Sequence, residues 1–575
     1  MVEPKPWPEV PVGNKDHTQA AVVIIGAGMS GLCMAIDLIK RINCRNFVII
    51  EKGSGCGGTW RDNKYPGCCC DIWSHLYSFS FEQNPDWTRT HPGQEELQNI
   101  ARKWDLFRHM RLNTVVEEAQ WDDFAMKWRT TVRVAGEKDR EFVENYTISS
   151  DFLVSTVGQL NVPQYPTIPG MDDFEGKSMH SARWDCSYDL RGKRVAVIGN
   201  DKPIPDCFPG ASAVQLIPEV AKVASSLTIF QRQANWLLPR GDAAIPAYRR
   251  ALYRWCPPYR WRKRAVIMDS REEAHEGYYN PWSLGSQFVK DQFQMMLKRD
   301  LPHRPDLWDK LTPKYSPGCK RIIFSNDWFK SFANPHVHLE TKHISRVTNN
   351  GIEVEGGDHQ EFDLVVYATG FRSVQFMYPI KIGGSEGRSL SDIWQDGPQA
   401  YFGITVESLP NFGMLYGPNT NLGHNSVVLM IEAQSRYIAG MVKTVLNARR
   451  KGKTLAIKPK PEIFRAFNAE LQNRLGKLTF ADPNCSSWYK TKDGRITNNW
   501  SGTVVEYQKN VEKVKWNDYV VEGSGADLVG EELKIGRVVE ETQVSNNTIW
   551  WSAVSLLFAG TMYTTGKFNF LLRTS

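Results

Sequence analysis

The chain has 575 residues, too many for one ordinary hydrophobic core, so we expect two or three domains. Its residues are 41% hydrophobic and 23% charged, the balance of a soluble globular protein. The formal net charge of +7 is spread along the chain, without a basic block or a nucleic-acid-binding motif. The composition therefore argues against a nucleic-acid partner.

Eleven cysteines are present, and three of them, Cys68 to Cys70, are adjacent. This run lacks the ligand spacing of a zinc site and has no second run to pair with, so we expect no metal site. We expect reduced, mostly buried thiols, which suit the cytoplasm. The N-terminal segment 1–17 is polar and rich in proline, and it lacks the apolar core of a signal peptide.

Near the N-terminus, apolar runs at 21–25 and 47–50 predict two strands, with a helix expected at 32–41 between them. The first strand is followed by GAGMSG. Gly26 allows a tight turn, Gly28 lets a pyrophosphate approach the backbone, and Gly31 lets the helix pack on the strand. The helix N-terminus supplies free N–H groups to the phosphates, and Glu51 ends the second strand, where a carboxylate can accept from ribose hydroxyls. The pattern predicts a dinucleotide site without separating FAD from NAD.

A second strand–loop–helix unit begins at Val195, and its loop is interrupted. Residues 201–209, DKPIPDCFP, stand between the two halves of a phosphate loop and include three prolines, which remove backbone donors and fix φ. Without them the chain reads Gly199, Asn200, Gly210, Ala211, Ser212, Ala213. Two interpretations stay open: the insert bulges outward and weakens nucleotide binding, or it is the remnant of an intron that the natural protein lacks.

The rest of the chain predicts a helical region, further elements of the nucleotide-binding units and a tail. Residues 236–330 are rich in Trp, Tyr, Arg and Lys and are expected to be mainly helical. A buried strand is expected at 362–367 and a helix at 430–446. From about residue 507 the composition changes to that of a separate tail.

A third motif lies between the two glycine loops. Phe174, Gly176, His180, Trp184 and Asp185 match the pattern F-x-G-x-x-x-H-x-x-x-W-[P/D]. This pattern resembles the fingerprint of the Baeyer–Villiger monooxygenases, flavoenzymes that depend on FAD and NADPH. Gly57-Gly58-Thr59-Trp60, with Tyr65-Pro66-Gly67 and Asp71, is similar to the second fingerprint of that family. The resemblance covers roughly residues 20–506.

The resemblance implies a fold, a reaction and a set of contacts. The fold is α/β, with two Rossmann-like dinucleotide-binding domains for FAD and NADP, a helical insertion and a C-terminal tail. The reaction takes a ketone, O2 and NADPH to an ester or lactone through a C4a-peroxyflavin. The expected domains are an FAD-binding domain at 1–165 and 356–506, an NADP-binding domain at 166–355 with a helical insertion at about 236–310, and a tail at 507–575. The expected cofactor-binding residues are Gly26, Gly28, Gly31, Glu51, Thr59, Trp60, Asp71, Tyr77, Gly199, Asn200, Gly210, Ala211, Ser212, Arg232, Gln233 and Lys320.

Two residues match the catalytic positions of the family. A guanidinium keeps its charge and offers forked donors, so Arg321 can serve the hydride step and then stabilise an oxyanion. Asp71 matches the acid that lies beside this arginine and orients it. Lys320 and Arg232 match contacts to the 2′-phosphate of NADPH, for which a point charge and a fork are suited. We interpret His180 as a structural or conformational residue. Trp500 either lines the pocket or belongs to the core.

Other functions stay open. A related N- or S-oxygenating flavin monooxygenase is one alternative, and an FAD-binding protein with NADPH turnover impaired by the insert is another. The aromatic content favours a bulky apolar ketone, although the sequence does not name it. The apolar run at 549–563 is short for a bilayer span, which needs about twenty residues. We interpret 549–572 as a buried or interfacial helix, so the expected location is cytoplasmic, with weak membrane association through this segment left open.

Overall fold

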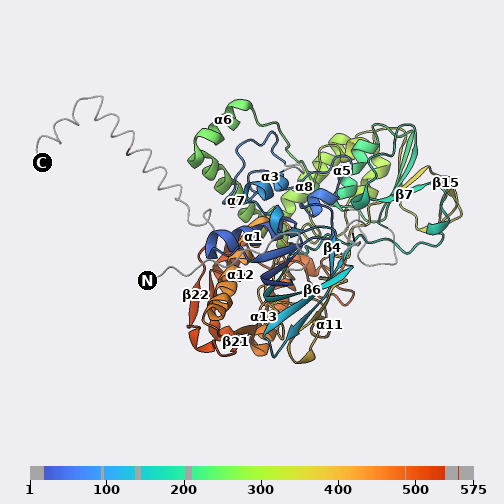
Figure 1. Ribbon diagram of the computed structural model, residues 1–575. Helices are drawn as coiled ribbons and strands as arrows, with labels where there is room; N and C mark the ends of the chain where they lie inside the picture. Colours follow the sequence, from blue (N-terminus) through green and yellow to red (C-terminus); the bar gives the residue numbers. More distant parts are fainter. Residues whose placement is uncertain are drawn as a thin grey trace, which may run out of the picture.

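The computed structural model describes residues 18–91, 96–135, 144–200, 210–485 and 487–537, together with Ser555. The insert at 201–209 and the tail segment 549–572, which contains the apolar run at 549–563, lie outside the described residues, apart from Ser555. Two sheets organise the molecule, one in the lower lobe with β4 and β6 and one in the lobe that carries β7 and α5 (Figure 1).

The larger sheet has eight strands in the order β17-β4-β5-β6-β1-β2-β3, with β18 pairing on β6. Its centre is parallel, because β1 pairs in parallel with both β2 and β6, while β4, β5 and β6 pair antiparallel. The strands are β1 (Gln19–Ile25), β2 (Phe47–Ile50), β3 (Met110–Arg111), β4 (Thr114–Asp122), β5 (Lys127–Val134), β6 (Asn145–Ser155), β17 (Lys381–Gly383) and β18 (Phe412–Met414).

The pattern of the first unit dictates its structure. β1 and β2 are apolar on both faces and buried, as strands in the middle of a parallel sheet must be. The helix between them, α1 (Met29–Ile42), ends at Asn43 in the left-handed conformation, with Lys40 and Arg41 in its last turn. The long helix α12 (Val427–Arg450) packs against α1 and is buried along most of its length. The predicted strands and helices of this region are confirmed, with helix ends extended by a few residues.

The second sheet is parallel throughout, in the order β12-β9-β8-β16-β7. Its strands are β7 (Lys177–His180), β8 (Arg194–Asn200), β9 (Ser226–Gln231), β12 (Val337–Glu340) and β16 (Leu364–Tyr367). The predicted strand at 362–367 is thus β16, and it pairs with β7 and β8. Residues 364–367, which we expected in the second part of the FAD-binding domain, thus form a strand of the second sheet, between β8 and the edge strand β7.

Helices link the two sheets and cover them. The predicted helical region is confirmed, since 236–330 contains five helices and only two short strands among its described elements, β10 (Leu237–Leu238) and β11 (Ile323–Phe324). Its helices are α6 (Ala247–Trp255), α7 (Pro257–Tyr279), α8 (Leu284–Asp300), α9 (Trp308–Leu311) and α10 (Trp328–Ser331). Elsewhere lie α2 (Thr59–Asp62), α3 (Glu96–Lys103), α5 (Ala211–Val220), α11 (Leu390–Ile393), α13 (Pro461–Leu475) and α14 (Val504–Asn510).

Small antiparallel sheets complete the chain. They are formed by β13 (Ile344–Val347), β14 (Gly351–Val354) and β15 (His359–Glu361), by β19 (Ala456–Pro459) with β21 (Tyr519–Glu522), and by β20 (Lys513–Lys515) with β22 (Glu532–Lys534). The first part of the predicted tail, 507–537, is therefore folded onto the rest of the chain through β19. Within the described residues, no helix combines the length and apolar character needed to cross a membrane.

Candidate active site

The first glycine loop is held by close backbone packing. Gly26 has a φ of +107°, a conformation that side-chain-bearing residues rarely adopt. A Cβ on Gly31 would lie 2.0 Å from the carbonyl oxygen of Gly26, so α1 can approach β1 only with glycine at this position. Gly28 is the N-cap residue of α1 and has no side chain to satisfy the first N–H groups. The loop therefore leaves a helix N-terminus open to an anion.

Glu51 ties this loop to the next strand. One carboxylate oxygen accepts from the backbone N–H of Ala27 at 2.8 Å, and the other accepts from the N–H of Gly53 at 2.7 Å. The side chain is nearly buried and lines the same pocket as Gly26 and Gly28. The two bonds fix the carboxylate at the end of β2, in the wall of this pocket.

The second loop has the same helix start. Gly210 is the N-cap residue of α5, again without a side chain, and Gly199 and Asn200 end β8. Ala211 and Ser212 begin the helix and line the pocket. Both glycine loops therefore direct a helix N-terminus toward one cavity.

That cavity has a volume of about 410 Å³ and lies where the two units meet. Most of the predicted site residues line it: Gly26, Gly28, Glu51, Thr59, Trp60, Asp71, Tyr77, Gly210, Ala211, Ser212, Lys320 and Arg321. Trp60 and Tyr77 form part of the wall, with the indole N–H donating to the tyrosine hydroxyl at 3.2 Å. The set fits a large planar ligand with a pyrophosphate, because aromatic walls adjoin exposed backbone N–H groups.

Arg321 and Asp71 form an ion pair in this pocket. Nε of Arg321 donates to Oδ2 of Asp71 at 2.9 Å, and the carboxylate is almost fully buried. Burial opposes the charge of the guanidinium, but the neighbouring Asp71 holds the pKa of Arg321 above its ordinary value. The arginine therefore carries a permanent positive charge inside the cavity.

Sequence reasoning missed Gln215, which connects this pair to the second unit. Its amide nitrogen donates to Oδ1 of Asp71 at 3.3 Å and to the carbonyl of Cys69 at 3.0 Å. Its amide oxygen accepts from the hydroxyl of Tyr65 at 2.9 Å. A signal was present, since Gln215 is a lone amide within an apolar helical run, and a buried amide must find partners.

Lys320 adjoins Arg321 but lies in a different environment. It is 5% exposed, and this burial lowers the pKa of its ammonium group to about 6. Its Nζ donates to the side-chain oxygen of Gln233 and lies 4.7 Å from the centroid of the Tyr315 ring. Arg232, the other predicted phosphate contact, is exposed directly after β9. Neither Arg232 nor Gln233 is among the described residues that line the cavity.

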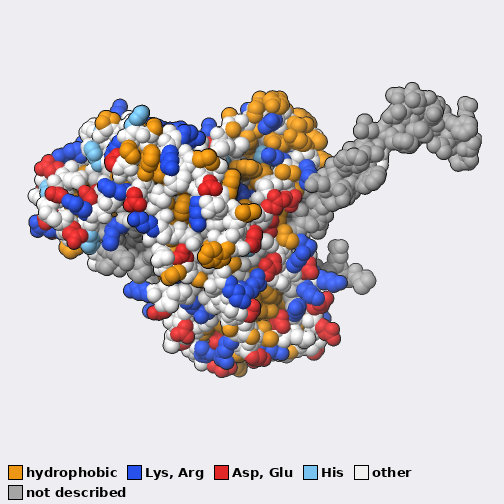
Figure 2. Space-filling model, turned by 180° about the vertical axis from the view of Figure 1, so that it is seen from behind, with side chains coloured by type: hydrophobic (Ala, Val, Ile, Leu, Met, Phe, Trp, Pro, Cys, Tyr) orange, Lys and Arg blue, Asp and Glu red, His pale blue; other side chains and the backbone are white. Residues whose placement is uncertain are grey.

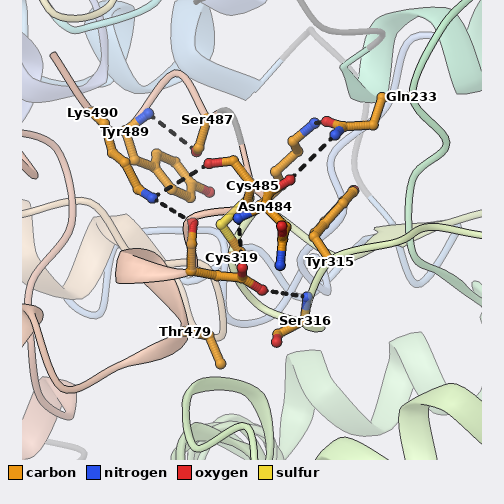
Figure 3. Close-up of a disulfide and its surroundings, with 12 residues drawn as sticks. Gln233, Tyr315, Ser316, Cys319, Thr479, Asn484, Cys485, Ser487, Tyr489 and Lys490 are labelled. Carbon is orange, nitrogen blue, oxygen red and sulfur yellow. Dashed lines mark hydrogen bonds between the residues drawn. A yellow bond between two sulfur atoms is a disulfide. The ribbon is translucent and has the colours of Figure 1, made fainter. Parts of the chain in front are cut away.

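A disulfide joins Cys319 to Cys485, so our expectation of reduced cysteines is wrong for this pair. The two residues are 166 positions apart, with Cα atoms 6.4 Å apart, and such a pairing cannot be inferred from sequence spacing. Figure 3 shows Cys485 beside Cys319, with Asn484 near Gln233. The amide of Gln233 donates to the carbonyl of Asn484 at 3.5 Å. The disulfide thus links the segment that carries Lys320 and Arg321 to the segment that ends at Cys485.

The residues of the third motif lie at the edge of the second sheet and, in the described chain, outside the cavity lining. His180 ends β7 and is buried, and its Nδ1 accepts from the backbone N–H of Ala182 at 3.0 Å. Burial lowers the pKa of His180 to about 4, so the ring is neutral at neutral pH. Asp185 accepts from Lys177 at 2.8 Å, and a Cβ on Gly176 would meet the Phe174 ring. Trp184 is half-buried. These contacts fit a structural role.

Trp500 is 3% exposed and packs in the core of the larger unit against Tyr507. Trp500 is not among the described residues that line the cavity, so its position favours a role in the hydrophobic core over a role in the pocket wall. Trp488 and Tyr416 line it instead.

Comparison with known proteins identifies one nucleotide-binding region and several relatives of the whole chain. A family described as "NAD(P)-binding Rossmann-like domain" matches residues 24–91, a range that includes the first glycine loop and Glu51. The chain is 50% identical to the FAD-binding monooxygenase ktnD of Aspergillus niger, over 96% of this chain and 90% of that protein. It is 37% identical to a Baeyer–Villiger monooxygenase of Streptomyces coelicolor, over 88% of this chain and 93% of that protein. A solved structure of an oxidised steroid monooxygenase bound to NADP matches with a TM-score of 0.74 at 26% identity, over 88% of this chain and 99% of that one.

Two helix N-termini that face one pocket fit an enzyme that binds two dinucleotides, and the relatives identify its class as the flavin monooxygenases. With these relatives, the chain belongs to the Baeyer–Villiger monooxygenases, a family of class B flavin monooxygenases. The resemblance predicted from the motifs is confirmed.

Proposed function

We propose that this chain oxidises a ketone to an ester or lactone, inserting one oxygen atom of O2 next to the carbonyl. FAD and NADPH are its cofactors, in line with its FAD-binding and NADP-bound relatives. When bound, FAD supplies the redox chemistry by taking electrons from NADPH and passing them to O2. The proposed ketone is bulky and apolar.

The observation that carries this proposal is the buried Arg321–Asp71 pair in the pocket shared by both glycine loops. Oxygen insertion next to a carbonyl passes through an oxyanion, and a fixed guanidinium in a sheltered pocket stabilises that charge. Asp71 orients the guanidinium through its Nε, so the remaining N–H groups stay available to a ligand. Gln215 in turn holds Asp71 from the second unit.

The roles of the other residues follow from their positions. The N-termini of α1 and α5 would hold the pyrophosphates of FAD and NADPH, and Glu51 the ribose of FAD. Trp60 and Tyr77 would pack beside the flavin ring. Lys320 and Arg232 would contact the 2′-phosphate, which favours NADPH over NADH.

The test is a product analysis under isotopically labelled O2, with NADPH and a panel of apolar ketones and thioethers. We expect an ester or lactone that carries one labelled oxygen, and little sulfoxide. Arg321→Ala should lower kcat for the ketone roughly a hundredfold or more, because one oxyanion-stabilising group is lost. Sulfoxide formation with no ester from any ketone would instead assign the chain to S-oxygenation.

A further inference from the structure

The outer side of α6 presents apolar side chains to solvent. Tyr248, Leu252 and Trp255 are spaced i, i+4, i+7 and therefore lie on one side of the helix. Tyr248 is 67% exposed and Trp255 is 81% exposed. Tyr259 and Trp261, at the start of α7, are exposed as well. We call these five residues the aromatic face. In Figure 2, hydrophobic side chains gather at the top of the molecule over this region.

This exposure belongs to a helix that is firmly docked. On the inner side of α6, Tyr253 is buried and its ring meets the ring of His75 at 4.6 Å. In α7, the buried Arg264 donates to the carbonyls of His75 and Ser78, at 2.7 and 2.8 Å. The two helices thus have a packed side and an apolar outer side. Contiguous apolar surface that the fold itself does not cover marks a site of interaction.

The charged residues within the segment that carries the aromatic face are all cationic. Residues 248–266 contain no Asp or Glu. Cationic side chains are interleaved with the aromatic ones: Arg249, Arg250, Arg254, Arg260, Arg262 and Lys263. Arg254 forms an ion pair with Asp86, and Arg249 lies over the ring of Tyr248 at 5.9 Å. Even with that pair, the surface combines Trp and Tyr rings with an excess of positive charge.

We propose that the aromatic face docks the protein onto the surface of an anionic lipid bilayer. Trp and Tyr rings are enriched where acyl chains meet headgroups, and Arg side chains reach from such a position to the phosphates. Each cation near an anionic surface adds to the attraction, which salt screens. We choose this occupant by charge complementarity, because an apolar patch interleaved with an excess of cations matches the apolar interior and negative surface of such a bilayer.

The test is flotation of the full-length, FAD-loaded protein with vesicles of phosphatidylcholine, alone or mixed with phosphatidylserine. We expect binding to the mixed vesicles, weakened by high salt. Combining Tyr248→Ser with Trp255→Ser should lower the partition coefficient by about tenfold or more, because two rings lose their apolar burial. Arg249→Glu should lower it about fivefold or more.

The matched control is Trp282→Ser. Trp282 is 92% exposed, more than Trp255, but it lies between α7 and α8, beyond the acidic residues Glu273 and Glu276. Its loss should leave vesicle binding unchanged. Circular dichroism and retained FAD absorbance report whether each variant is folded.

Three results would overturn the proposal. One is wild-type protein that does not bind the mixed vesicles. Another is binding that the aromatic-face variants retain while Trp550→Ser with Trp551→Ser abolishes it, which assigns attachment to the tail. The last is aromatic-face variants that change the oligomeric state in size-exclusion chromatography while vesicle binding persists, which assigns the face to a second copy of the chain.

Discussion

The helices that follow the two glycine loops begin with the same N-cap geometry, whereas the connections from strand to helix differ in length. Gly28 caps α1 with φ −78° and ψ −169°, and Gly210 caps α5 with φ −78° and ψ −171°. A serine is the second helical residue in both, Ser30 and Ser212. Residues 26–28 join strand to helix in the first loop, whereas residues 201–210 do so in the second. The backbone geometry that would face a pyrophosphate is therefore set by residues from the N-cap onward. It is the same in both helices, although residues 201–209 precede the second N-cap.

The loops also differ three residues after the cap. Gly31 occupies this position in the first loop, and Ala213 occupies it in the second. The methyl of Ala213 is fully buried, so the second helix stands far enough from its strand to hold it. The first loop leaves no such space, since a Cβ on Gly31 would meet the carbonyl of Gly26 at 2.0 Å.

Exchanging these two residues should give the largest effect. We expect Gly31→Ala to lower the free energy of unfolding by about 3 kcal/mol and to release FAD, because backbone must move to admit the methyl. Ala213→Gly, the reverse change in the second loop, should cost about 1 kcal/mol through helix propensity and leave FAD bound. Thermal unfolding and flavin absorbance after gel filtration measure both. Equal losses in the two variants would contradict the difference in packing.

Deleting residues 201–209 tests whether the insert impairs the second loop. We expect the apparent dissociation constant for NADPH to fall by about tenfold, because a short turn would hold the phosphate against the N-terminus of α5. FAD content should not change, which serves as the control within the same sample. Unchanged NADPH binding would show that the insert bulges away without effect.

Gln215, on α5 of the second unit, donates a hydrogen bond to Asp71 in the active site. Its substitution should therefore lower turnover more than nucleotide binding. We expect Gln215→Met to lower kcat about tenfold, with little change in the KM for NADPH, because buried hydrogen bonds to Asp71 and Cys69 disappear. Gln472→Met is a matched control, since Gln472 also makes two backbone bonds, both to Ile496, away from the pocket lining. A purely structural role would lower the stability of both variants alike and leave kcat per folded enzyme intact.

The pH dependence of NADPH binding should give the smallest effect. Lys320 has a pKa lowered to about 6 by burial, and a bound 2′-phosphate would raise that pKa again. Below about pH 6 the ammonium group of Lys320 is already charged and attracts the phosphate. Above that pH the lysine must first take up a proton, which weakens NADPH binding. We expect the KM for NADPH to rise between pH 6 and 8, by less than tenfold per unit, and the KM for NADH to stay flat. Lys320→Arg, which stays charged throughout, should remove the slope. A slope that survives in this variant would exclude Lys320 as its source.

Sequence patterns predicted most of the architecture because local chemistry decides it. The glycine loops, the buried strands and the helical region follow from spacing and apolar periodicity, and Glu51, Asp71 and Arg321 meet the pocket as the motifs indicate. What could not be predicted depends on long-range pairing. Cys319 and Cys485 are brought together only by folding, and the partners of Gln215 lie about 145 residues earlier in the chain. The assignment of β16 to the second sheet likewise depends on which strand edge is open.

Anaerobic mixing of the FAD-loaded protein with NADPH shows whether both glycine loops serve one redox site. We expect the yellow absorbance of oxidised FAD to bleach rapidly with NADPH and much more slowly with NADH. Protein that retains FAD and stays yellow with excess NADPH would contradict this expectation, and would leave an FAD-binding protein whose second site does not deliver electrons.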